Sequence, residues 1–517
     1  MRREALRNLL PGEDDPATWI PALSLGVIST SLLAAACGGG GTPAAPTPTP
    51  TPTPKPPNFI VIMGDDLEAK ALDRMPRLQS LLTNAGLTFN NSFVTTPLCC
   101  PSRASFLTGQ YAHNHGNLSN GPPRGGYQAF RDQGRESSTL ATWLKAAGYK
   151  TVLLGKYLNQ FPEGKDTLVP PGWDEWYGVL EDRRAELSFY SLNDNGVIRN
   201  FAGRDEANYQ TDVLLARSLD FIRRAESNDD QPFFLFLGVA APHVPAVPAD
   251  RHKDTFGDLT APRSSSFNEE DVTDKPAWLK RQKLLAESDI DRIDAEYSDR
   301  QRSLQAVDEA IGKIFEVLEA TQETGNTYVF FTSDNGLLQG QHRLKGKDAP
   351  YEESIRVPLI VRGPGVPAGA STDLQVTNLD LAPTLAKLGR ATAPDTVDGR
   401  SLDALLSANP PSAANWRKDF LIEFLAADGG GSESATGGPV RAESVAARFM
   451  PDYVGVRAES QTYVEYATDE TELYDLKADP DQVQNLTTTG GAEASTLAAL
   501  RARVAALKVC KGASCRN

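Results

Sequence analysis

The sequence is short of positive charge. It holds 52 lysines and arginines against 67 aspartates and glutamates, which gives a formal net charge of −15 at pH 7. Nucleic-acid-binding chains carry a basic excess, so this balance argues against a nucleic-acid partner and against a surface that binds polyanions in general. If the protein acts on an anionic polymer, a local basic cleft must bind it.

The sequence also lacks an apolar run suited to span a membrane. The one near the N-terminus, residues 19–36, is short and contains Pro21, which disfavours a spanning helix. Basic residues precede this run, and small residues end it at Cys37, as in a secretory signal. Residues 1–37 resemble a bacterial lipoprotein signal in which Cys37 is lipidated. The alternatives are a cleaved secreted protein and an uncleaved membrane anchor.

Residues 38–57 are of low complexity, four glycines followed by repeated Thr-Pro. Alternating Thr-Pro is extended and semi-rigid, so this linker would hold a domain away from a membrane or wall. We therefore expect an exported bacterial protein, membrane-anchored through lipid only and otherwise periplasmic or secreted.

Cysteine is scarce, with five residues in the chain. Outside the reducing cytoplasm, Cys510 and Cys515 are expected to form a local disulfide, and two exposed free thiols are the alternative. Cys37 is assigned to processing. Cys99 and Cys100 remain for chemistry.

The body of the chain alternates short buried strands with helices, and no internal repeat is visible. This order predicts an α/β fold with a mostly parallel sheet between helices in residues 58–405. In residues 406–517, short alternating strands followed by a helical segment predict a smaller C-terminal antiparallel sheet plus helix. The predicted strands are 58–63, 87–94, 149–154, 233–239, 327–331, 358–361, 454–457, 463–466 and 472–476, and the predicted helices are 75–82, 139–147, 207–225, 287–320 and 492–507.

Polar side chains follow the ends of the predicted parallel strands. In an open α/β sheet that edge is where ligands bind, so these side chains should converge although they are far apart in the sequence. They are Asp65, Asp66, Lys156, His243, Asp334 and Asn335.

Two acidic pairs among them predict a metal site. Asp65-Asp66 and Asp334-Asn335 offer three carboxylates and one amide. Hard oxygen ligands suit Ca²⁺ or Mg²⁺ rather than zinc. Either pair alone could instead be a turn or a helix cap.

The most informative stretch is Cys99-Cys100-Pro101-Ser102-Arg103, followed by Leu107-Thr108-Gly109. Proline favours the first turn of a helix, and a helix start offers free N–H groups to an anion. Arg103 adds a cation whose geometry suits sulfate or phosphate oxygens. The stretch is thus a candidate anion site, and a buried structural cysteine pair is the alternative.

This stretch resembles the signature of the sulfatase family, and further blocks resemble that family in the same order. Together they cover essentially everything after residue 58. They are most similar to the N-acetylglucosamine-6-sulfatase and extracellular heparan-sulfatase branch, and bacterial arylsulfatases share them. The blocks are residues 98–109, 111–115, 155–159, 170–173, 241–243 and 333–336, Lys347 with Tyr351-Glu352, and 472–476.

The resemblance implies an alkaline phosphatase-like fold and a sulfuric ester hydrolase. Cys99 would be oxidised to formylglycine (3-oxoalanine) by a formylglycine-generating enzyme, and its hydrate would be the nucleophile. Arg103 and Lys156 would hold the hydrate and the sulfate, while His243 and Lys347 would bind sulfate and protonate the leaving alcohol. Asp334 would be the base for the attacking hydroxyl. The metal ligands would be Asp65, Asp66, Cys99, Asp334 and Asn335.

One position departs from the usual family pattern. Many sulfatases have a histidine where this chain has Leu158, and the branch named above shares the departure. His115, also a candidate substrate ligand, and His342 could deprotonate the second hydroxyl instead, or be structural histidines. Lys345 competes with Lys347 for the lysine role.

The substrate would be a sulfated sugar or an aryl sulfate. Residues 116–135, residues 251–278 and the C-terminal sheet are the expected determinants of which one. Phosphodiester or phosphonate ester hydrolysis is an alternative activity, since related enzymes of the superfamily use the same metal and motif. A non-catalytic glycan-binding role with Cys99 unmodified is the alternative of a different class.

Overall fold

The computed structural model describes residues 55–161, 167–180, 187–227, 231–425 and 450–516. The predicted signal at 1–37, with Cys37, and most of the linker at 38–57 lie outside these residues. Residues 55–517 form one compact unit that carries both the large sheet and the C-terminal sheet. Among the described residues, no helix has the length and hydropathy needed to cross a bilayer.

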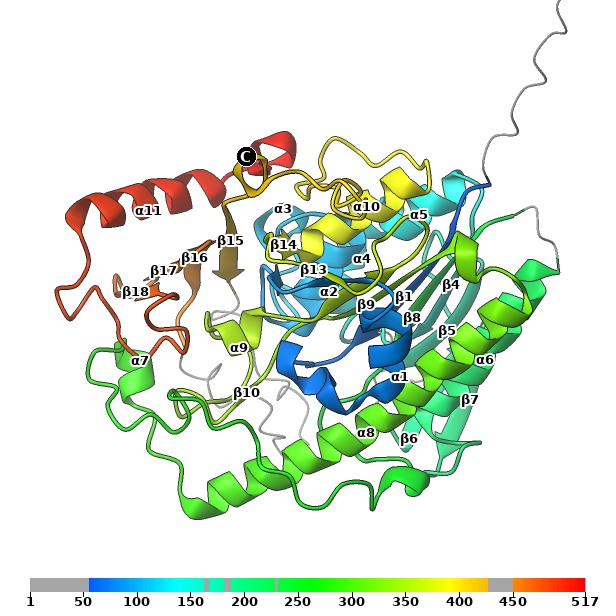
Figure 1. The fold of residues 1–517 in the computed structure, drawn as a ribbon, viewed down its shortest axis with the longest axis horizontal. Helices are drawn as coiled ribbons and strands as arrows, with labels where there is room; N and C mark the ends of the chain where they lie inside the picture. Colours follow the sequence, from blue (N-terminus) through cyan, green and yellow to red (C-terminus); the bar gives the residue numbers. More distant parts are fainter. Residues whose placement is uncertain (1–54, 162–166, 181–186, 228–230, 426–449, 517) are drawn as a thin grey trace, which may run out of the picture. The chain divides into compact units, whose positions relative to one another are not determined.

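A ten-stranded sheet forms the centre of this unit (Figure 1), in the order β13-β2-β12-β9-β1-β8-β4-β5-β6-β7. β9, β1, β8, β4 and β5 run parallel, as expected for buried strands followed by helices. The strands are β1 Asn58–Gly64, β2 Leu87–Phe89, β4 Lys150–Gly155, β5 Glu175–Leu180, β6 Phe189–Asp194, β7 Val197–Ala202, β8 Phe233–Gly238, β9 Thr327–Ser333, β12 Leu359–Arg362 and β13 Ala370–Thr372.

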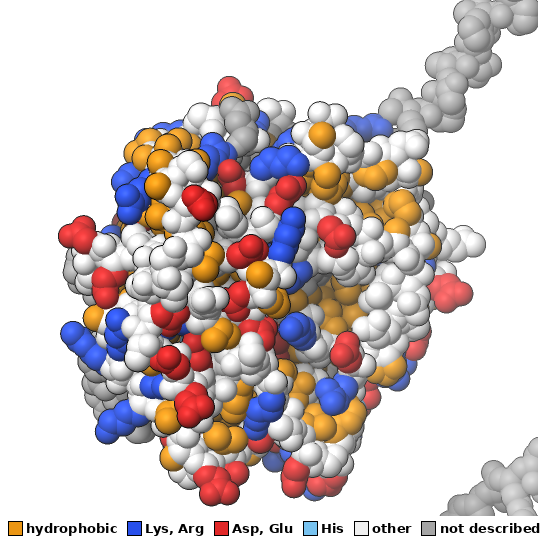
Figure 2. Space-filling view, turned by 60° about the vertical axis from the view of Figure 1, so that its left-hand side comes forward, with side chains coloured by type: hydrophobic (Ala, Val, Ile, Leu, Met, Phe, Trp, Pro, Cys, Tyr) orange, Lys and Arg blue, Asp and Glu red, His pale blue; other side chains and the backbone are white. Residues whose placement is uncertain are grey.

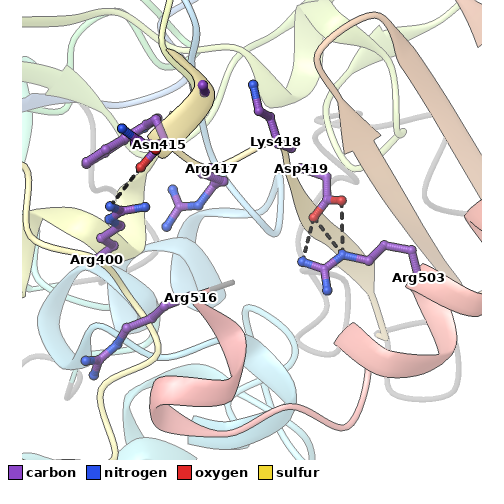
Figure 3. A pocket seen from close by; sticks show the side chains of 9 residues that line it. Arg400, Asn415, Arg417, Lys418, Asp419, Arg503 and Arg516 are labelled. Atoms are coloured by element: carbon purple, nitrogen blue, oxygen red, sulfur yellow. Dashed lines mark hydrogen bonds and ion pairs between the residues drawn. The ribbon is translucent and has the colours of Figure 1, made fainter. Parts of the chain in front are cut away.

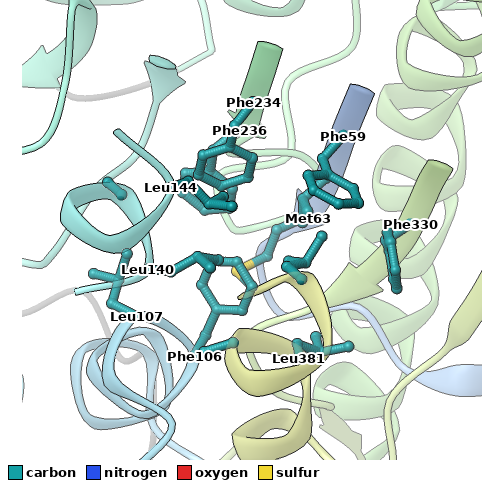
Figure 4. Packing of buried hydrophobic residues seen from close by; sticks show 14 of the residues in the cluster. Phe59, Met63, Phe106, Leu107, Leu140, Leu144, Phe234, Phe236, Phe330 and Leu381 are labelled. Carbon is teal, nitrogen blue, oxygen red and sulfur yellow. The ribbon is translucent and has the colours of Figure 1, made fainter. Parts of the chain in front are cut away.

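Helices cover both faces of the sheet because its central strands are apolar on both sides. Along β1, Phe59, Val61 and Met63 pack on one cluster, while Ile60 and Ile62 pack on the other. α6 and α8 lie on the second face (Figure 1). Figure 4 shows the first cluster, where Phe106 of α2, Leu140 of α5 and Leu381 of α10 meet the sheet. The helices are α1 Pro76–Leu78, α2 Cys99–Thr108, α3 Ala112–His115, α4 Gly126–Asp132, α5 Leu140–Ala146, α6 Gln210–Glu226, α7 Ala277–Lys280, α8 Glu287–Ala320, α9 Glu352–Ile355, α10 Leu381–Leu388 and α11 Ala494–Leu507.

The C-terminal sheet is antiparallel, as predicted, with α11 packed on it. It has four strands where three were predicted, because β15 precedes them. Its strands are β15 Asp419–Phe424, β16 Tyr453–Ala458, β17 Gln461–Tyr466 and β18 Thr471–Asp475. A disulfide joins Cys510 to Cys515 just after α11, while Cys99 and Cys100 are buried free thiols.

Further details differ from the prediction. The strand expected at 87–94 is broken at Asn90-Asn91 into β2 and β3 (Ser92–Phe93), and β3 pairs with β14 (Val376–Thr377). β12 was found but runs antiparallel to β9. β6 and β7 extend the sheet as an antiparallel hairpin; β7 is largely exposed, so its sequence lacked the apolar run used to recognise strands. β10 (Leu338–Gln339) and β11 (Lys345–Gly346) form a separate short pair.

Candidate active site

Cys99 is the first residue of α2 and is fully buried. Pro101 lies in the first turn of this helix, where its missing N–H costs no hydrogen bond. Gly109 ends the helix with a φ of 65°, the left-handed conformation that glycine adopts most readily. All ten residues of α2 are buried. The side chain of residue 99 is thus held rigidly at a helix start.

Two carboxylates and a histidine surround Cys99. The Cys99 Sγ lies 3.6 Å from Asp65 Oδ1 and 3.9 Å from Asp66 Oδ1. Asp65 and Asp66 follow the end of β1, and His243 follows the end of β8. One ligand atom from each of these four residues lies within 4.8 Å of the others. The predicted convergence at the carboxyl edge of the sheet is therefore present.

Three cations complete this cluster. Lys347 Nζ lies 2.8 Å from Cys99 Sγ and 2.6 Å from Asp66 Oδ1. Lys156, which follows β4, places its Nζ 2.7 Å from Asp65 Oδ2. Arg103, one turn into α2, donates from Nε to Asp334 Oδ2 at 2.7 Å. Ammonium and guanidinium groups fixed in a buried site stabilise charge that develops on substrate oxygens.

Burial and charge act against each other on the ionisable groups. Burial would raise the pKa of Asp65 and Asp66, but the cations outweigh it. Lys156 holds the pKa of Asp65 well below its usual range, and Lys347 lowers that of Asp66 to about 2. Burial raises the pKa of the Cys99 thiol well above its usual value despite two nearby lysines. The carboxylates are therefore charged, and the unmodified sulfur is a neutral thiol.

Asp334 and Asn335 follow β9 and are fully buried. Asp334 Oδ1 accepts the backbone N–H of Asp66 at 3.1 Å. Asn335 donates to Asp66 Oδ1 at 2.6 Å, and its own Oδ1 has no hydrogen-bond partner among the described residues. A buried amide oxygen without a donor beside three carboxylates is suited to a hard cation. The residues present therefore fit a Ca²⁺ or Mg²⁺ ion.

His243 presents a defined nitrogen to the cluster. Its Nδ1 lies 2.6 Å from the Val244 carbonyl oxygen, which only accepts, so Nδ1 carries the proton. The Nε2 faces Asp66 Oδ2 at 3.6 Å. That nitrogen can bind an anion when protonated and can release its proton to a leaving group.

The structure places the remaining candidates away from these contacts. His115 is fully buried against α2; its Nε2 lies 3.1 Å from Ser105 Oγ, and its Nδ1 accepts from the Asn117 backbone. Burial lowers the pKa of His115 to about 3, so it is neutral. Its role as substrate ligand or base stays a prediction.

The two other candidates, His342 and Lys345, and the departing residue Leu158 each have a defined packing position. His342 pairs with Glu269 and stacks on Tyr351. Leu158 packs in the core. Lys345 pairs with Glu296, so Lys347 is the lysine that contacts the cluster.

Arg300 was not predicted as a site residue. This buried side chain of α8 donates to the backbone oxygens of Asp66 and Pro242, at 2.6 and 3.0 Å, and pairs with Glu68. It thereby joins the loop after β1 to the loop after β8. In the sequence it is one arginine among many on a long helix, so only its burial could have identified it.

Comparisons with known proteins agree with this geometry. The family model described as Sulfatase matches residues 57–391. The chain is 33% identical to human N-acetylglucosamine-6-sulfatase, covering 89% of this chain and 86% of that protein. It is 32% identical to an arylsulfatase of Volvox carteri, covering 89% and 76%. With an extracellular sulfatase Sulf-1 homologue of Caenorhabditis elegans it shares 36% identity over 71% of this chain and spans only 52% of that protein.

Solved structures share the fold. A protein crystallised with its substrate D-glucosamine-2-N,6-O-disulfate superposes with a TM-score of 0.68 at 23% identity, covering 87% of this chain and 97% of that one. A phosphonate monoester hydrolase of Agrobacterium radiobacter gives 0.63 at 22% identity, covering 86% and 96%. The family model spans more than half of the chain. The chain belongs to the sulfatase family, whose enzymes hydrolyse sulfate esters.

Proposed function

We propose that this protein releases inorganic sulfate from monoesters of sulfated sugars resembling N-acetylglucosamine-6-sulfate, or from aryl sulfates. The observation that carries the proposal is the position of Cys99, buried at a helix start between Asp65, Asp66 and the Lys347 ammonium. The likeness to N-acetylglucosamine-6-sulfatase and arylsulfatase along most of the chain supports this substrate class.

Residue 99 needs modification to serve as the nucleophile. A formylglycine made from Cys99 would supply, when hydrated, an oxygen nucleophile and a second hydroxyl that restores the aldehyde. Arg103, Lys156 and Lys347 are the cations close enough to bind the sulfate oxygens. His243 Nε2 and Lys347 Nζ are the groups placed to give a proton to the leaving alcohol, and Asp334 is the proposed base.

We assign the metal site to Asp65, Asp66, Asp334 and Asn335, together with residue 99. The unpartnered Oδ1 of Asn335 supports this set. A divalent cation there would polarise a sulfate oxygen and help to position the nucleophile. His243 lies within the same cluster, but its nitrogen suits Ca²⁺ poorly, so we assign it to the substrate.

Export is part of the same proposal. A formylglycine-generating enzyme would act on the chain in its host, and lipidation of Cys37 with the Thr-Pro linker would hold residues 58–517 outside the cytoplasm. Extracellular sulfatases among the relatives support a location outside the cell.

The test is a peptide mass map across Cys99 on protein made in its own host. We expect an aldehyde at position 99 and an unmodified thiol at Cys100, which serves as the control in the same peptide. The Cys99→Ala variant should lose at least about a thousandfold in sulfate release, as expected when a covalent nucleophile is removed.

A panel of esters distinguishes the alternatives. N-acetylglucosamine-6-sulfate and an aryl sulfate should be hydrolysed in preference to phosphodiesters and phosphonate esters. An alkylatable thiol at Cys99 in host-made protein would exclude the formylglycine mechanism and favour phosphoester hydrolysis or a binding role.

A further inference from the structure

A cationic pocket lies outside the cluster of Asp65, Asp66, Cys99 and His243. It has a volume of about 410 Å³, and none of its nine lining residues belongs to that cluster. Five of them are arginines or lysines and one is an aspartate. Figure 3 shows these side chains coming from the chain around residue 400, the residues leading into β15, and the C-terminal region. The charged lining residues are Arg400, Arg417, Lys418, Asp419, Arg503 and Arg516.

Three of these cations are neutralised by partners. Arg417 is buried and makes a bidentate ion pair with Asp380. Arg503 pairs with Asp419, and Lys418 with Glu459 at 2.8 Å. Figure 3 shows the Arg503–Asp419 contact. These pairs leave little net charge of their own.

Arg400 and Arg516 are different. Arg400 donates to the backbone oxygen of Asn415 at 3.2 Å, and Arg516 to that of Val397. Neither has a carboxylate partner among the described residues. The pocket therefore carries an excess of two positive charges on a chain of net charge −15.

The pocket wall is held in place without a ligand. Arg400 stacks on Trp416 at 4.1 Å, and the Trp416 indole N–H donates to Gln375 O at 2.8 Å. Asp380 accepts both the Arg400 backbone N–H and the Arg417 guanidinium. The Cys510–Cys515 disulfide closes the turn that immediately precedes Arg516. Such preorganisation lowers the entropy cost of binding an anion.

The face of the molecule drawn in Figure 2 mixes the two signs of charge. In Figure 2, lysine and arginine side chains are interspersed with aspartate and glutamate. A polyanion would therefore be repelled or weakly bound over such a mixed surface and attracted at a local excess of arginine. The planar guanidinium of arginine can also donate to two oxygens of a sulfate or carboxylate group at once.

We infer that the pocket around Arg400 and Arg516 is a secondary binding site for sulfate groups of a sulfated glycan, separate from the site that cleaves the ester. The inference rests on the proposed function, since it takes the substrate to be a sulfated sugar chain. It would let the enzyme hold one part of a polymer while it acts on another.

The test measures by calorimetry how tightly a heparin decasaccharide binds to the native protein and to variants, at low and at physiological ionic strength. We expect Arg400→Ala/Arg516→Ala to bind about tenfold more weakly, with a shallower salt dependence, because two exposed charge contacts are lost. Hydrolysis of a small aryl sulfate should be unchanged, which shows that the variant is folded. The charge-preserving Arg400→Lys/Arg516→Lys variant should retain most of the affinity.

A matched control removes two cations elsewhere. Arg223→Ala/Lys313→Ala, on the exposed surfaces of α6 and α8, should bind the decasaccharide like the native protein. Equal losses in both double variants, or native affinity in the Arg400/Arg516 variant, would overturn the inference. Failure of the proposed function would show separately, as native protein that releases no sulfate from any small ester.

Discussion

Asn335 in the candidate site has a buried oxygen for which the described residues supply no hydrogen-bond donor. Its Oδ1 is buried and has no donor among the described residues, while its Nδ2 is held by Asp66 Oδ1 and Gly336 O. An unsatisfied buried oxygen costs about 1–3 kcal/mol. A cation bound there would remove this cost.

We therefore predict that Ca²⁺ stabilises the native protein by about 2.7 kcal/mol when its free concentration is a hundredfold above Kd. The melting temperature should rise accordingly. Asn335→Ala should weaken Ca²⁺ binding at least about tenfold. Asn409→Ala, an exposed asparagine, is the control and should respond like native protein. A Ca²⁺ titration followed by thermal melting checks this without any activity measurement, and a native-like response of Asn335→Ala would refute it.

At the scale of elements, α8 connects the sheet to the active site. It runs for 34 residues, and its buried Arg300 holds the Asp66 and Pro242 carbonyl oxygens. The first carbonyl belongs to Asp66 itself, and the second belongs to the residue just before His243. A single helix thus sets the spacing between two parts of the catalytic cluster.

Arg300→Met should destabilise the protein by about 3–5 kcal/mol, because Glu68 is left buried without its cation. The Glu68→Gln/Arg300→Met variant removes that unpaired charge and should recover most of the stability. It should still show a kcat reduced about tenfold or more with KM less affected, since both loops lack their donor. Urea unfolding and steady-state kinetics separate the two effects. Native kcat in the double variant would mean that Arg300 is only structural.

At the scale of the whole described unit, His113 joins three regions. Its Nδ1 lies 2.9 Å from Glu423 of β15, and its Nε2 lies 3.1 Å from the Cys510 carbonyl oxygen. Burial alone would lower its pKa, but the hydrogen bond and charge of Glu423 raise it above 6.5. The protonated form is therefore preferred in the folded state.

This raised pKa predicts a pH-dependent stability. The folded state binds the His113 proton more tightly than the unfolded state, so the contribution is complete below pH 6.5 and is lost as pH rises through the folded pKa. Midpoints of urea unfolding should fall over this range in native protein and fall less in His113→Gln. Parallel pH profiles for the two proteins would rule out this role.

The candidate site was predictable wherever its chemistry is local in sequence. Cys99 and Arg103 are one helical turn apart, and Asp65, Lys156, His243 and Asn335 each follow a strand that its apolar residues identify. Parallel strands bring their carboxyl ends to one edge, so their convergence follows from the strand pattern.

Other features depend on contacts between distant residues and could not be predicted in this way. Lys347 was already favoured over Lys345 by the family resemblance, and its Nζ contacts Asp66. The antiparallel course of β12, by contrast, rests on its pairing with β9. The exposed hairpin strand β7 lacks a distinctive local pattern, whereas β15 carries the apolar run Phe420-Leu421-Ile422 and was missed despite it.

The sequence by itself determined the family, the α/β order of elements and the residue types of the catalytic cluster, because these depend on local patterns and short motifs. The tertiary structure decided which charges are paired. Arg300 is tied to the loops after β1 and β8 by residues far away in the chain. Among the residues that the structure describes, Arg400 and Arg516 donate to backbone oxygens and have no carboxylate partner. Burial and pairing with distant residues set the free energy of a charged side chain. Neither can be inferred from the residues next to it in the sequence.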